Sequence, residues 1–357
     1  MLTKREKINV LMVGVDSGRI GGMWSVADSY INSQQYNDNI NLIYIPTSTG
    51  GNIFKRLYKM LTGYCRILNC FFKNKIDIVH IHMAEKGSVY RKGVVLKIAN
   101  LFGVKTVVQM HAGPIMDWYH GLSNQKKKTV KRIFNRCDRM LVLGEYWKNQ
   151  LLEIVSDSKI DVLYNGTNCS EENMYNVNGK YVLFLGMITK RKGAYDLIEA
   201  INKIDNLLDE DIQFLFCGYD EDSKAENYTI SLSLQNRIIF LGWVNKEEKE
   251  KYFRNSRLCV LPSYFEGLSM TVIESIAHGI PVVTSNISTM PEILGDSIHL
   301  VEPGDVEDLA KTLLNILSDA NMRQYQSNYV FERAKNIFSI EKNIDNTINI
   351  YQRCLER

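Results

Sequence analysis

Residues 261–285, LPSYFEGLSMTVIESIAHGIPVVTS, hold two acidic side chains around one expected helix start. An apolar run ends at Pro262, Glu266 lies in the loop that follows, and Ser269 can cap a helix that carries Glu274. The N–H groups at a helix N-terminus attract anions, and carboxylates accept hydrogen bonds from sugar hydroxyls. Phosphate and hydroxyl chemistry together predict a nucleotide sugar as the ligand. A solvated acidic loop is the alternative interpretation.

Glycines follow the first apolar run of the chain, in GVDSGRIGGMWSVADSY (residues 14–30). Their spacing does not match G-x-G-x-x-G, which disfavours a nicotinamide dehydrogenase. Gly21 and Gly22 precede an expected helix whose first N–H groups could receive a phosphate. The alternative is a strand-to-helix turn that needs glycine only for steric reasons.

His111 ends another apolar run, in VVQMHAG (residues 107–113). A lone histidine is usually a hydrogen-bonded core residue, and this stays the alternative. Because His111 stands at the end of an expected strand, where α/β proteins place their functional loops, we interpret it as a site residue.

Short β-branched apolar runs alternate with helical stretches in both halves of the chain, which predicts parallel α/β sheets covered on both faces. The expected strands are 8–13, 40–45, 76–82, 106–110, 140–143, 162–164, 181–185, 212–217, 238–241, 258–261 and 282–284.

The polar segment 169–180 has no apolar period and is the expected linker. We therefore predict Rossmann-like domains at residues 1–170 and 178–336, facing each other across a cleft. The apolar spacing in 337–357 predicts a terminal helix that can pack back on the first domain.

The composition narrows the class of protein. The 357 residues are 45% apolar and 23% charged, which is typical of a globular protein with room for two domains. The seven cysteines contain no C-x-x-C pair, and we find no metal-ligand pattern, so no metal site is expected. The N-terminal apolar run is too short for a signal peptide, and no segment reaches the roughly 18 apolar residues of a membrane span. These features predict a cytoplasmic protein.

Basic residues concentrate in the first half of the chain. Residues 1–170 hold 24 basic and 12 acidic side chains, whereas the remainder holds 19 and 28. Segment 54–75 is an expected amphipathic helix with basic side chains on one side and apolar ones roughly opposite, and 125–132 adds five cations.

These two segments predict a peripheral interaction with an anionic membrane surface, such as the inner face of the plasma membrane. The alternative is that the apolar stripe of 54–75 packs on its own sheet. Because no recognised nucleic-acid motif accompanies the basic clusters, we expect no nucleic-acid partner.

The residues EGLSMTVIE, followed by SIAHGIPVVTS, resemble the E-x7-E signature of retaining GT-B glycosyltransferases of family four, the group 1 type. The stretch LFLGMITKRKGAYDLIEAI (183–201) is similar to the family's G-R-x-x-x-x-K-G element. The paired glycines 21–22, His111 and the LYNG of 163–166 match further family positions, so the resemblance covers most of the chain. It implies a GT-B fold of two Rossmann-like domains.

The resemblance also implies residue roles. Glu266 would contact hydroxyls of the donor sugar, and the N–H groups of Gly267, Leu268 and Ser269 would hold the distal phosphate. Glu274 would bind the ribose hydroxyls.

Three further roles follow from the same resemblance. Lys192 would neutralise the departing diphosphate. His111 would orient the donor sugar or the incoming hydroxyl, and Gly21 and Gly22 would contribute to donor binding.

The chain departs from the family pattern at Met187, where the family usually has arginine. One of two expected diphosphate cations is therefore missing. Lys190 or Arg191, in the same loop, are the candidates to replace it, and both could instead be solvated.

We therefore expect a retaining glycosyltransferase of the hexosyltransferase class. It would move a sugar from a nucleotide-diphosphate sugar, with UDP favoured, to a glycan or a polyprenyl-diphosphate-linked acceptor in surface polysaccharide synthesis (capsule, O-antigen or exopolysaccharide). The nucleotide sugar is a co-substrate, and no cofactor is expected. The alternatives are a nucleotide-sugar epimerase or hydrolase, which would need no acceptor, and a non-catalytic nucleotide-sugar-binding protein, which Met187 favours.

Overall fold

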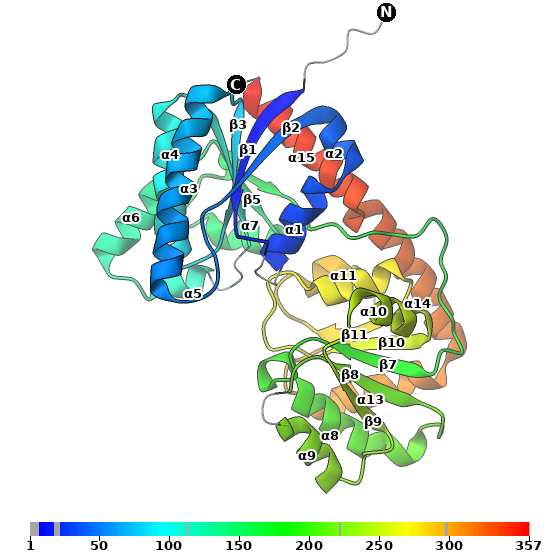
Figure 1. Cartoon of the computed structure of the whole chain (residues 1–357). Coiled ribbons are helices and arrows are strands. Elements are labelled where there is room, and N and C mark those ends of the chain that lie inside the picture. The colour runs from blue at the N-terminus through cyan, green and yellow to red at the C-terminus, as the bar shows by residue number, and fades with distance from the viewer. Residues whose placement is uncertain are drawn as a thin grey trace, which may run out of the picture. The chain divides into compact units, whose positions relative to one another are not determined.

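The computed structural model describes residues 7–17, 22–111, 113, 115–220, 223–296 and 299–356. The chain divides into two compact units (Figure 1). The first unit comprises residues 1–166 and 340–357, and the second comprises 167–339. Gly21 lies outside the described residues, whereas Gly22 begins the first helix.

The first unit is built on a parallel sheet of six described strands in the order β2-β1-β3-β4-β5-β6. Its strands are β1 (Ile8–Gly14), β2 (Ile40–Pro46), β3 (Ile78–Met83), β4 (Lys105–Met110), β5 (Arg139–Val142) and β6 (Ile160–Val162). Its helices are α1 (Gly22–Ile31), α2 (Gln34–Asn39), α3 (Ile53–Lys73), α4 (Gly87–Leu101), α5 (Ile115–His120), α6 (Asn124–Phe134), α7 (Glu145–Leu151), η1 (Asp157–Lys159) and α15 (Ile340–Leu355).

Helices cover both faces of this sheet. One buried cluster joins α1, α2 and α15 to the strands through Val10, Tyr30, Val107 and Tyr351. Helices α3, α4 and α6 lie on the other face, where Figure 1 shows them side by side. The C-terminal helix is therefore part of the first unit.

The second unit repeats the architecture, with described strands in the order β12-β11-β10-β7-β8-β9, all parallel. Its strands are β7 (Tyr181–Leu185), β8 (Gln213–Cys217), β9 (Ile238–Gly242), β10 (Ser256–Leu261), β11 (Val282–Ser285) and β12 (Leu300–Val301). Its helices are η2 (Lys190–Lys192), α8 (Ala194–Ile204), η3 (Asp205–Leu207), α9 (Lys224–Ser231), α10 (Lys246–Arg254), α11 (Met270–Ala277), α12 (Met290–Leu294), α13 (Val306–Ser318), α14 (Ala320–Arg333) and η5 (Ala334–Phe338).

The sequence prediction of an α/β protein with two Rossmann-like sheets is confirmed. Each predicted run contributes a strand, although β6 begins at Ile160 and ends at Val162, two residues earlier than expected. The two-residue strand β12 was not predicted, because Leu300–Val301 is too short to show a period.

The segment predicted as the linker belongs to the second unit. The side-chain amide of Asn173 donates to Oγ of Ser327 at 2.9 Å, and the hydroxyl of Tyr175 donates to the carbonyl of Arg257 at 2.8 Å. The division between the units falls at residues 166 and 167 instead. Polar composition alone did not distinguish a segment that is hydrogen-bonded to its own unit from a linker between the units.

Candidate functional site

Two loops of the second unit bring three polar side chains together where neighbouring strands end. Lys192 follows β7, and Ser263 and Glu266 follow β10, the strand that pairs with β7. Nζ of Lys192 lies 2.5 Å from Oε1 of Glu266, and Oγ of Ser263 donates to the same oxygen at 2.8 Å. The side chains of Lys192 and Glu266 are only 15% and 8% exposed. The sequence predicted both charged residues, but not that they pair.

The backbone approach of the two loops requires a glycine after Lys192. Gly193 has a φ of 70°, and a Cβ at this position would lie 2.0 Å from the carbonyl oxygen of Pro262. The N–H of Tyr264 also donates to the carbonyl of Arg191 at 2.9 Å. Because Gly193 has no Cβ, the β7 loop can pack directly against the β10 loop.

The β10 loop is fixed by hydroxyl groups that follow β11. Oγ of Ser288 donates to the carbonyl of Glu266 at 2.7 Å, and Oγ1 of Thr289 donates to the carbonyl of Gly267 at 3.1 Å. These two hydrogen bonds tie the β10 loop to the segment that follows β11. Sequence reasoning missed these two hydroxyls, because nothing in a single sequence indicates which backbone carbonyl they reach.

Helix α11 begins where the sequence predicts. Ser269 is its N-cap, and its side chain accepts a hydrogen bond from the N–H of Val272. Oγ1 of Thr271 donates to the carbonyl of Leu185 at 3.1 Å, which ties the first turn of α11 to the end of β7. The positively polarised start of α11 therefore lies in the same loop system as Lys192 and Glu266.

Glu274, the second acid of the predicted pair, points from α11 to α10. Its Oε2 lies 2.7 Å from Nζ of Lys249, and its side chain is 26% exposed. Glu274 and Glu266 therefore each have a lysine partner. The sequence did not indicate Lys249 as a neighbour of this residue.

Met187, Lys190 and Arg191 belong to the loop after β7 that also carries Lys192. The side chain of Met187 is 56% exposed. Nη1 of Arg191 donates to the carbonyl of Phe265 at 3.1 Å. Arg191 and Lys190 also line a hollow of about 680 Å³, together with Tyr195, Asp196, Glu199, Tyr228 and Tyr264.

In the first unit, His111 lies beside another histidine. Nε2 of His111 is 2.8 Å from Nδ1 of His82, which is on β3. Burial lowers the pKa of His111 to about 3, and the charge of His80 contributes to that shift. The His111 ring is therefore uncharged at neutral pH.

His82 and His80 are both completely buried. Nδ1 of His80 hydrogen-bonds to the hydroxyl of Tyr351 at 2.5 Å, and that hydroxyl lies 3.1 Å from the hydroxyl of Tyr36. Desolvation lowers the pKa of His80 to about 3 and raises that of Tyr351. This network belongs to the core and links β3 to α15.

A buried lysine holds the end of β1. Nζ of Lys92, on α4, donates to the carbonyl of Gly14 at 3.2 Å and to Oγ1 of Thr47 at 2.7 Å. Burial lowers the pKa of Lys92 to about 7. Around Gly22, a Cβ would meet no described atom within 4 Å, so crowding does not explain that glycine.

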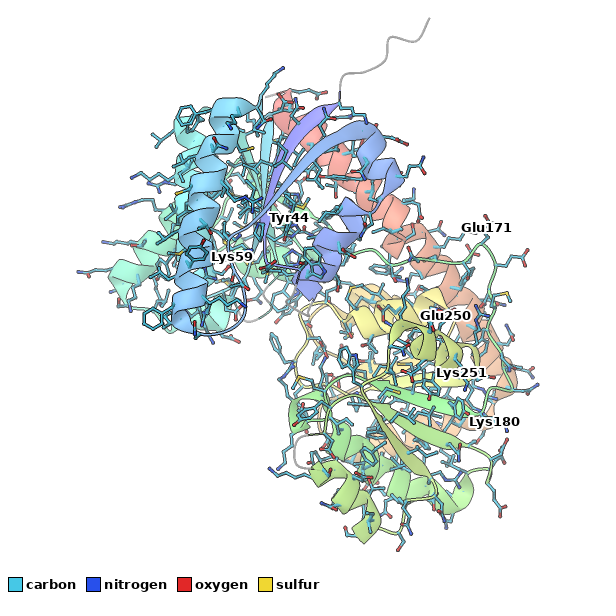
Figure 2. All side chains as sticks on the ribbon, in the orientation of Figure 1. Tyr44, Lys59, Glu171, Lys180, Glu250 and Lys251 are labelled. Carbon is cyan, nitrogen blue, oxygen red and sulfur yellow. The ribbon has the colours of Figure 1, made fainter. Side chains whose placement is uncertain are left out.

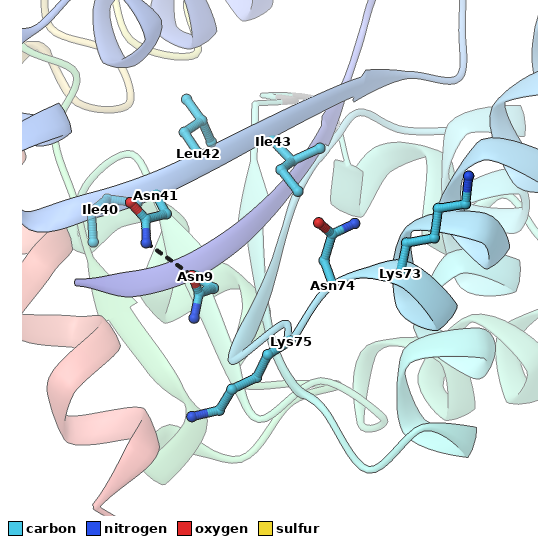
Figure 3. Close-up of a pocket in the computed structure, with 8 residues that line it drawn as sticks. All are labelled: Asn9, Ile40, Asn41, Leu42, Ile43, Lys73, Asn74 and Lys75. Atoms are coloured by element: carbon cyan, nitrogen blue, oxygen red, sulfur yellow. Dashed lines mark hydrogen bonds between the residues drawn. The ribbon is translucent and has the colours of Figure 1, made fainter. Parts of the chain in front are cut away.

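A second hollow, of about 570 Å³, opens where β1 and β2 begin, and Asn9 and Asn41 line it (Figure 3). It lies at the opposite end of these strands from their functional loops. Within the described residues, no group of three or more His, Cys, Asp or Glu side chains is arranged to hold a metal ion. No described helix combines the length and the apolarity that a membrane span requires.

Comparison with known proteins assigns both parts of the chain. Residues 26–171 match the family model described as Glycosyltransferase Family 4, and residues 168–333 match the model described as Glycosyl transferases group 1. An uncharacterised glycosyltransferase of Methanocaldococcus jannaschii is 26% identical over 304 residues, which cover 84% of this chain and 82% of the relative.

Two further likenesses extend over nearly the whole chain. The UDP-Gal:α-D-GlcNAc-diphosphoundecaprenol α-1,3-galactosyltransferase of Escherichia coli is 24% identical over 342 residues, covering 88% of this chain and 84% of that protein. The crystal structure of HepE from Anabaena in complex with UDP and glucose superposes with a TM-score of 0.74 at 13% identity. This superposition covers 97% of the present chain and 100% of the HepE chain. The fold is that of GT-B glycosyltransferases, and the chain belongs to the family 4, group 1 glycosyltransferases.

Proposed function

We propose that this glycosyltransferase moves a sugar from a nucleotide-diphosphate donor, UDP-linked by preference, with retention of configuration at the anomeric carbon. The observation that carries the proposal is the cluster of Lys192, Ser263 and Glu266 beside the start of α11. One cation, one carboxylate and a helix N-terminus supply the groups that a diphosphate and a sugar hydroxyl need. The Anabaena neighbour, a complex with UDP and glucose, supports the donor class.

In this proposal Lys192 neutralises the diphosphate as it departs, and Glu266 accepts hydrogen bonds from donor-sugar hydroxyls. Lys192 and Ser263 both contact Oε1 of Glu266, so Oε2 takes neither bond. The backbone N–H groups of Gly267, Leu268 and Ser269 hold the distal phosphate.

Glu274 binds the ribose hydroxyls in this proposal, and Lys249 orients its carboxylate. Gly21 and Gly22 contribute to donor binding in this proposal. Lys190 and Arg191 both stay candidates for a second diphosphate cation, and the guanidinium of Arg191 donates to the carbonyl of Phe265.

The proposed reaction is attack from the face that the diphosphate leaves. The C–O bond to the diphosphate breaks, the acceptor oxygen bonds to the same face of the anomeric carbon, and the departing phosphate oxygen takes the acceptor proton. The lysine and the helix N-terminus stabilise the negative charge that develops on the leaving group. His111 orients the reacting oxygen.

A panel of nucleotide sugars and nucleotide diphosphates in a thermal-shift assay tests the donor class. A donor at about 100 times its dissociation constant stabilises the folded chain by about 2.7 kcal/mol, which is a readily measured shift. We expect a UDP-sugar to give the largest shift. If no member of the panel raises the melting temperature, the donor proposal is wrong.

The reaction class is tested by product analysis with and without acceptor. A transferase consumes donor in step with acceptor. Sugar release or isomerisation from donor alone would indicate the epimerase or hydrolase alternative. Donor binding without consumption would indicate the non-catalytic protein that the exposed Met187 favours.

For the acceptor, we propose a glycan or a polyprenyl-diphosphate-linked glycan of a surface polysaccharide. The name of the Escherichia coli relative describes transfer to a diphosphoundecaprenol-linked sugar. A lipid-linked acceptor is presented at a membrane, so the enzyme needs a surface that can approach one. Helix α3 offers such a surface.

The apolar stripe of α3 faces solvent. Only Gly63, Ile67 and Cys70 of this 21-residue helix are buried. Its exposed apolar side chains are Ile53, Phe54, Leu57, Tyr58, Leu61, Leu68 and Phe72, and the exposed fractions reach 78% at Phe54 and 77% at Phe72. The alternative that this stripe packs on its own sheet is therefore wrong.

The exposed stripe continues onto the end of α4 and has basic neighbours. The rings of Phe72 and Phe102 meet edge-on with centroids 5.4 Å apart, and Leu101 beside Phe102 is 77% exposed. Lys55 and Lys73 of α3 are exposed. Lys59, which Figure 2 labels on the same helix, pairs with Asp16 at 2.9 Å.

Helix α6, on the same face of the sheet, carries the cluster 125–132. Apolar side chains framed by cations match an anionic lipid surface. We therefore propose that the first unit docks on the inner face of the plasma membrane.

Flotation with lipid vesicles tests this docking. We expect the protein to float with vesicles that contain phosphatidylglycerol and not with pure phosphatidylcholine, because each basic residue near an anionic surface adds about 1 kcal/mol. The double variant Phe54→Glu, Leu57→Glu should stay at the bottom of the gradient.

The matched control is Tyr325→Glu, which changes an aromatic side chain that is 70% exposed in the second unit. It should float like the unchanged protein. The membrane proposal would be rejected if the α3 double variant floated as well as the unchanged protein. It would also be rejected if the unchanged protein did not float with anionic vesicles.

A further inference from the structure

His111 and His82 face each other across two neighbouring strands of the first sheet. Strands β3 and β4 are paired, and the N–H of His111 donates to the carbonyl of Met83 at 2.8 Å, which fixes the backbone next to the ring. The two imidazoles are 5.0 Å apart between centroids with an angle of 29°, and Nε2 of His111 is 2.8 Å from Nδ1 of His82. Two nitrogens at this distance share one proton.

The protein environment leaves both rings neutral. Burial lowers the pKa of His82 and of His111, the latter to about 3. One nitrogen of the pair must therefore be an N–H donor and the other an acceptor lone pair. Which of them donates decides the tautomer of His111.

The surroundings of His82 favour one answer. His82 is completely buried, and its Nε2 has no hydrogen-bond partner among the described residues. If Nε2 carried the proton, an unpaired N–H would be buried. Native structures avoid a buried unpaired donor more strictly than a buried unpaired acceptor. The proton therefore belongs on Nδ1, where it has a partner.

Packing holds the His82 ring in this orientation. It stacks on His80 with centroids 4.8 Å apart and an angle of 17°. His80 is in turn fixed by its hydrogen bond to Tyr351 on α15. A stacked and completely buried ring cannot exchange its two nitrogens without disturbing its neighbours.

We infer that His82 is a positioning residue: it donates Nδ1–H to Nε2 of His111 and so holds His111 in the tautomer that carries its proton on Nδ1. His111 then offers a ligand an N–H donor and no ring lone pair. It can hold the oxygen of a sugar or an acceptor hydroxyl, but it cannot remove a proton as a general base. This inference rests on the proposed function only for what His111 binds.

Nitrogen NMR of the histidine rings tests the tautomer directly. The full-length protein is labelled with ¹⁵N in both ring positions, and His111→Asn identifies the His111 signals by their loss. We expect Nδ1 of His111 to be protonated, Nε2 to be unprotonated, and neither to titrate between pH 5 and pH 8. A protonated Nε2, or an even mixture of tautomers, would overturn the inference.

Two substitutions at His82 link the tautomer to turnover. Asparagine places an amide N–H close to the position of Nδ1, so His82→Asn should keep both the His111 tautomer and a kcat within about threefold. Leucine has no hydrogen-bond donor, so in His82→Leu the ring of His111 should no longer be held in one tautomer. We expect kcat to fall by about 10- to 100-fold, with a smaller change in donor KM. Equal kcat values in two variants that melt normally would contradict a positioning role.

The inference about His82 and the transferase proposal can be contradicted independently of each other. The tautomer is read in the free protein, without donor or acceptor. If the protein transferred no sugar, the ring signals would still show whether His82 orients His111. If the signals showed the opposite tautomer, the transferase proposal would stand and only the role of His82 would fall.

Discussion

At the residue scale, the account depends on Lys192 and Glu266 being held before any ligand arrives. The two side chains are mostly buried and share a short contact that Ser263 completes. A buried carboxylate without its partners would be costly, so the pair is fixed in place by its own electrostatics. A diphosphate that enters this site finds Lys192 already oriented.

The first prediction concerns that lysine. Lys192→Ala should lower kcat by about 100-fold or more, because charge on the leaving group would develop without its nearest side-chain cation. Steady-state transfer assays at saturating donor measure the change.

Lys203→Ala is the matched control, since Lys203 is a half-exposed lysine of the same unit that pairs with Glu307 at 2.6 Å. It should leave kcat within about twofold. Near-normal turnover in Lys192→Ala would remove Lys192 from the site.

The sequence predicted the individual acids and the lysine of the site but not most of their partners. Glu266, Ser269 and Glu274 were identified from spacing around an expected helix start, and α11 begins there. Ser288 and Lys249 were missed. They come from elements whose approach depends on strand order and helix packing, and a single sequence carries no signal for either.

At the element scale, the close approach of the β7 and β10 loops depends on one glycine. Gly193→Ala should destabilise the protein by more than the roughly 1–2 kcal/mol of an alanine at positive φ, because its Cβ would meet Pro262 at 2.0 Å. Denaturant unfolding measures the loss, and donor affinity should fall with it.

Gly103 provides the comparison, because its φ is 68° and a Cβ there would meet nothing within 4 Å. Gly103→Ala should therefore show the backbone cost alone. Equal losses of stability in the two variants would mean that the contact between the loops is not tight.

Helix α3 shows where element prediction from sequence succeeds and where it stops. The period of residues 54–75 predicted an amphipathic helix, and α3 spans Ile53–Lys73. The apolar stripe does not face the sheet, however. Gly63 contacts the chain near Pro46 and Thr47 instead, where a Cβ would lie 3.0 Å from backbone and side-chain atoms. Period indicates that a helix has two faces, but not which face is buried.

At the scale of the whole molecule, buried histidines make stability depend on pH. Burial lowers the pKa of His80 and His111 to about 3 and that of His299 to about 4, against an ordinary value of 6.5. Below pH 6.5 the unfolded chain binds protons at these rings and the folded chain does not. The free energy of unfolding therefore falls as the pH drops from 6.5 towards 4, and these groups have no effect above that range.

Denaturant unfolding between pH 5 and pH 6 measures this slope. His299→Gln should reduce it by about 1 kcal/mol per pH unit, because one ring that protonates only in the unfolded state is gone. A slope that His299→Gln does not alter would contradict the burial argument.

The most direct test of the account compares a nucleotide sugar with its nucleotide diphosphate by calorimetric titration, using the unchanged protein and Glu266→Gln. If Glu266 holds donor-sugar hydroxyls, Glu266→Gln should lower the affinity for the nucleotide sugar by about tenfold, or about 1.4 kcal/mol. The affinity for the nucleotide diphosphate should stay within about twofold, because that ligand has no sugar for Glu266 to contact. Equal affinities of the two proteins for the nucleotide sugar would contradict the central claim that Glu266 and its loop bind the donor.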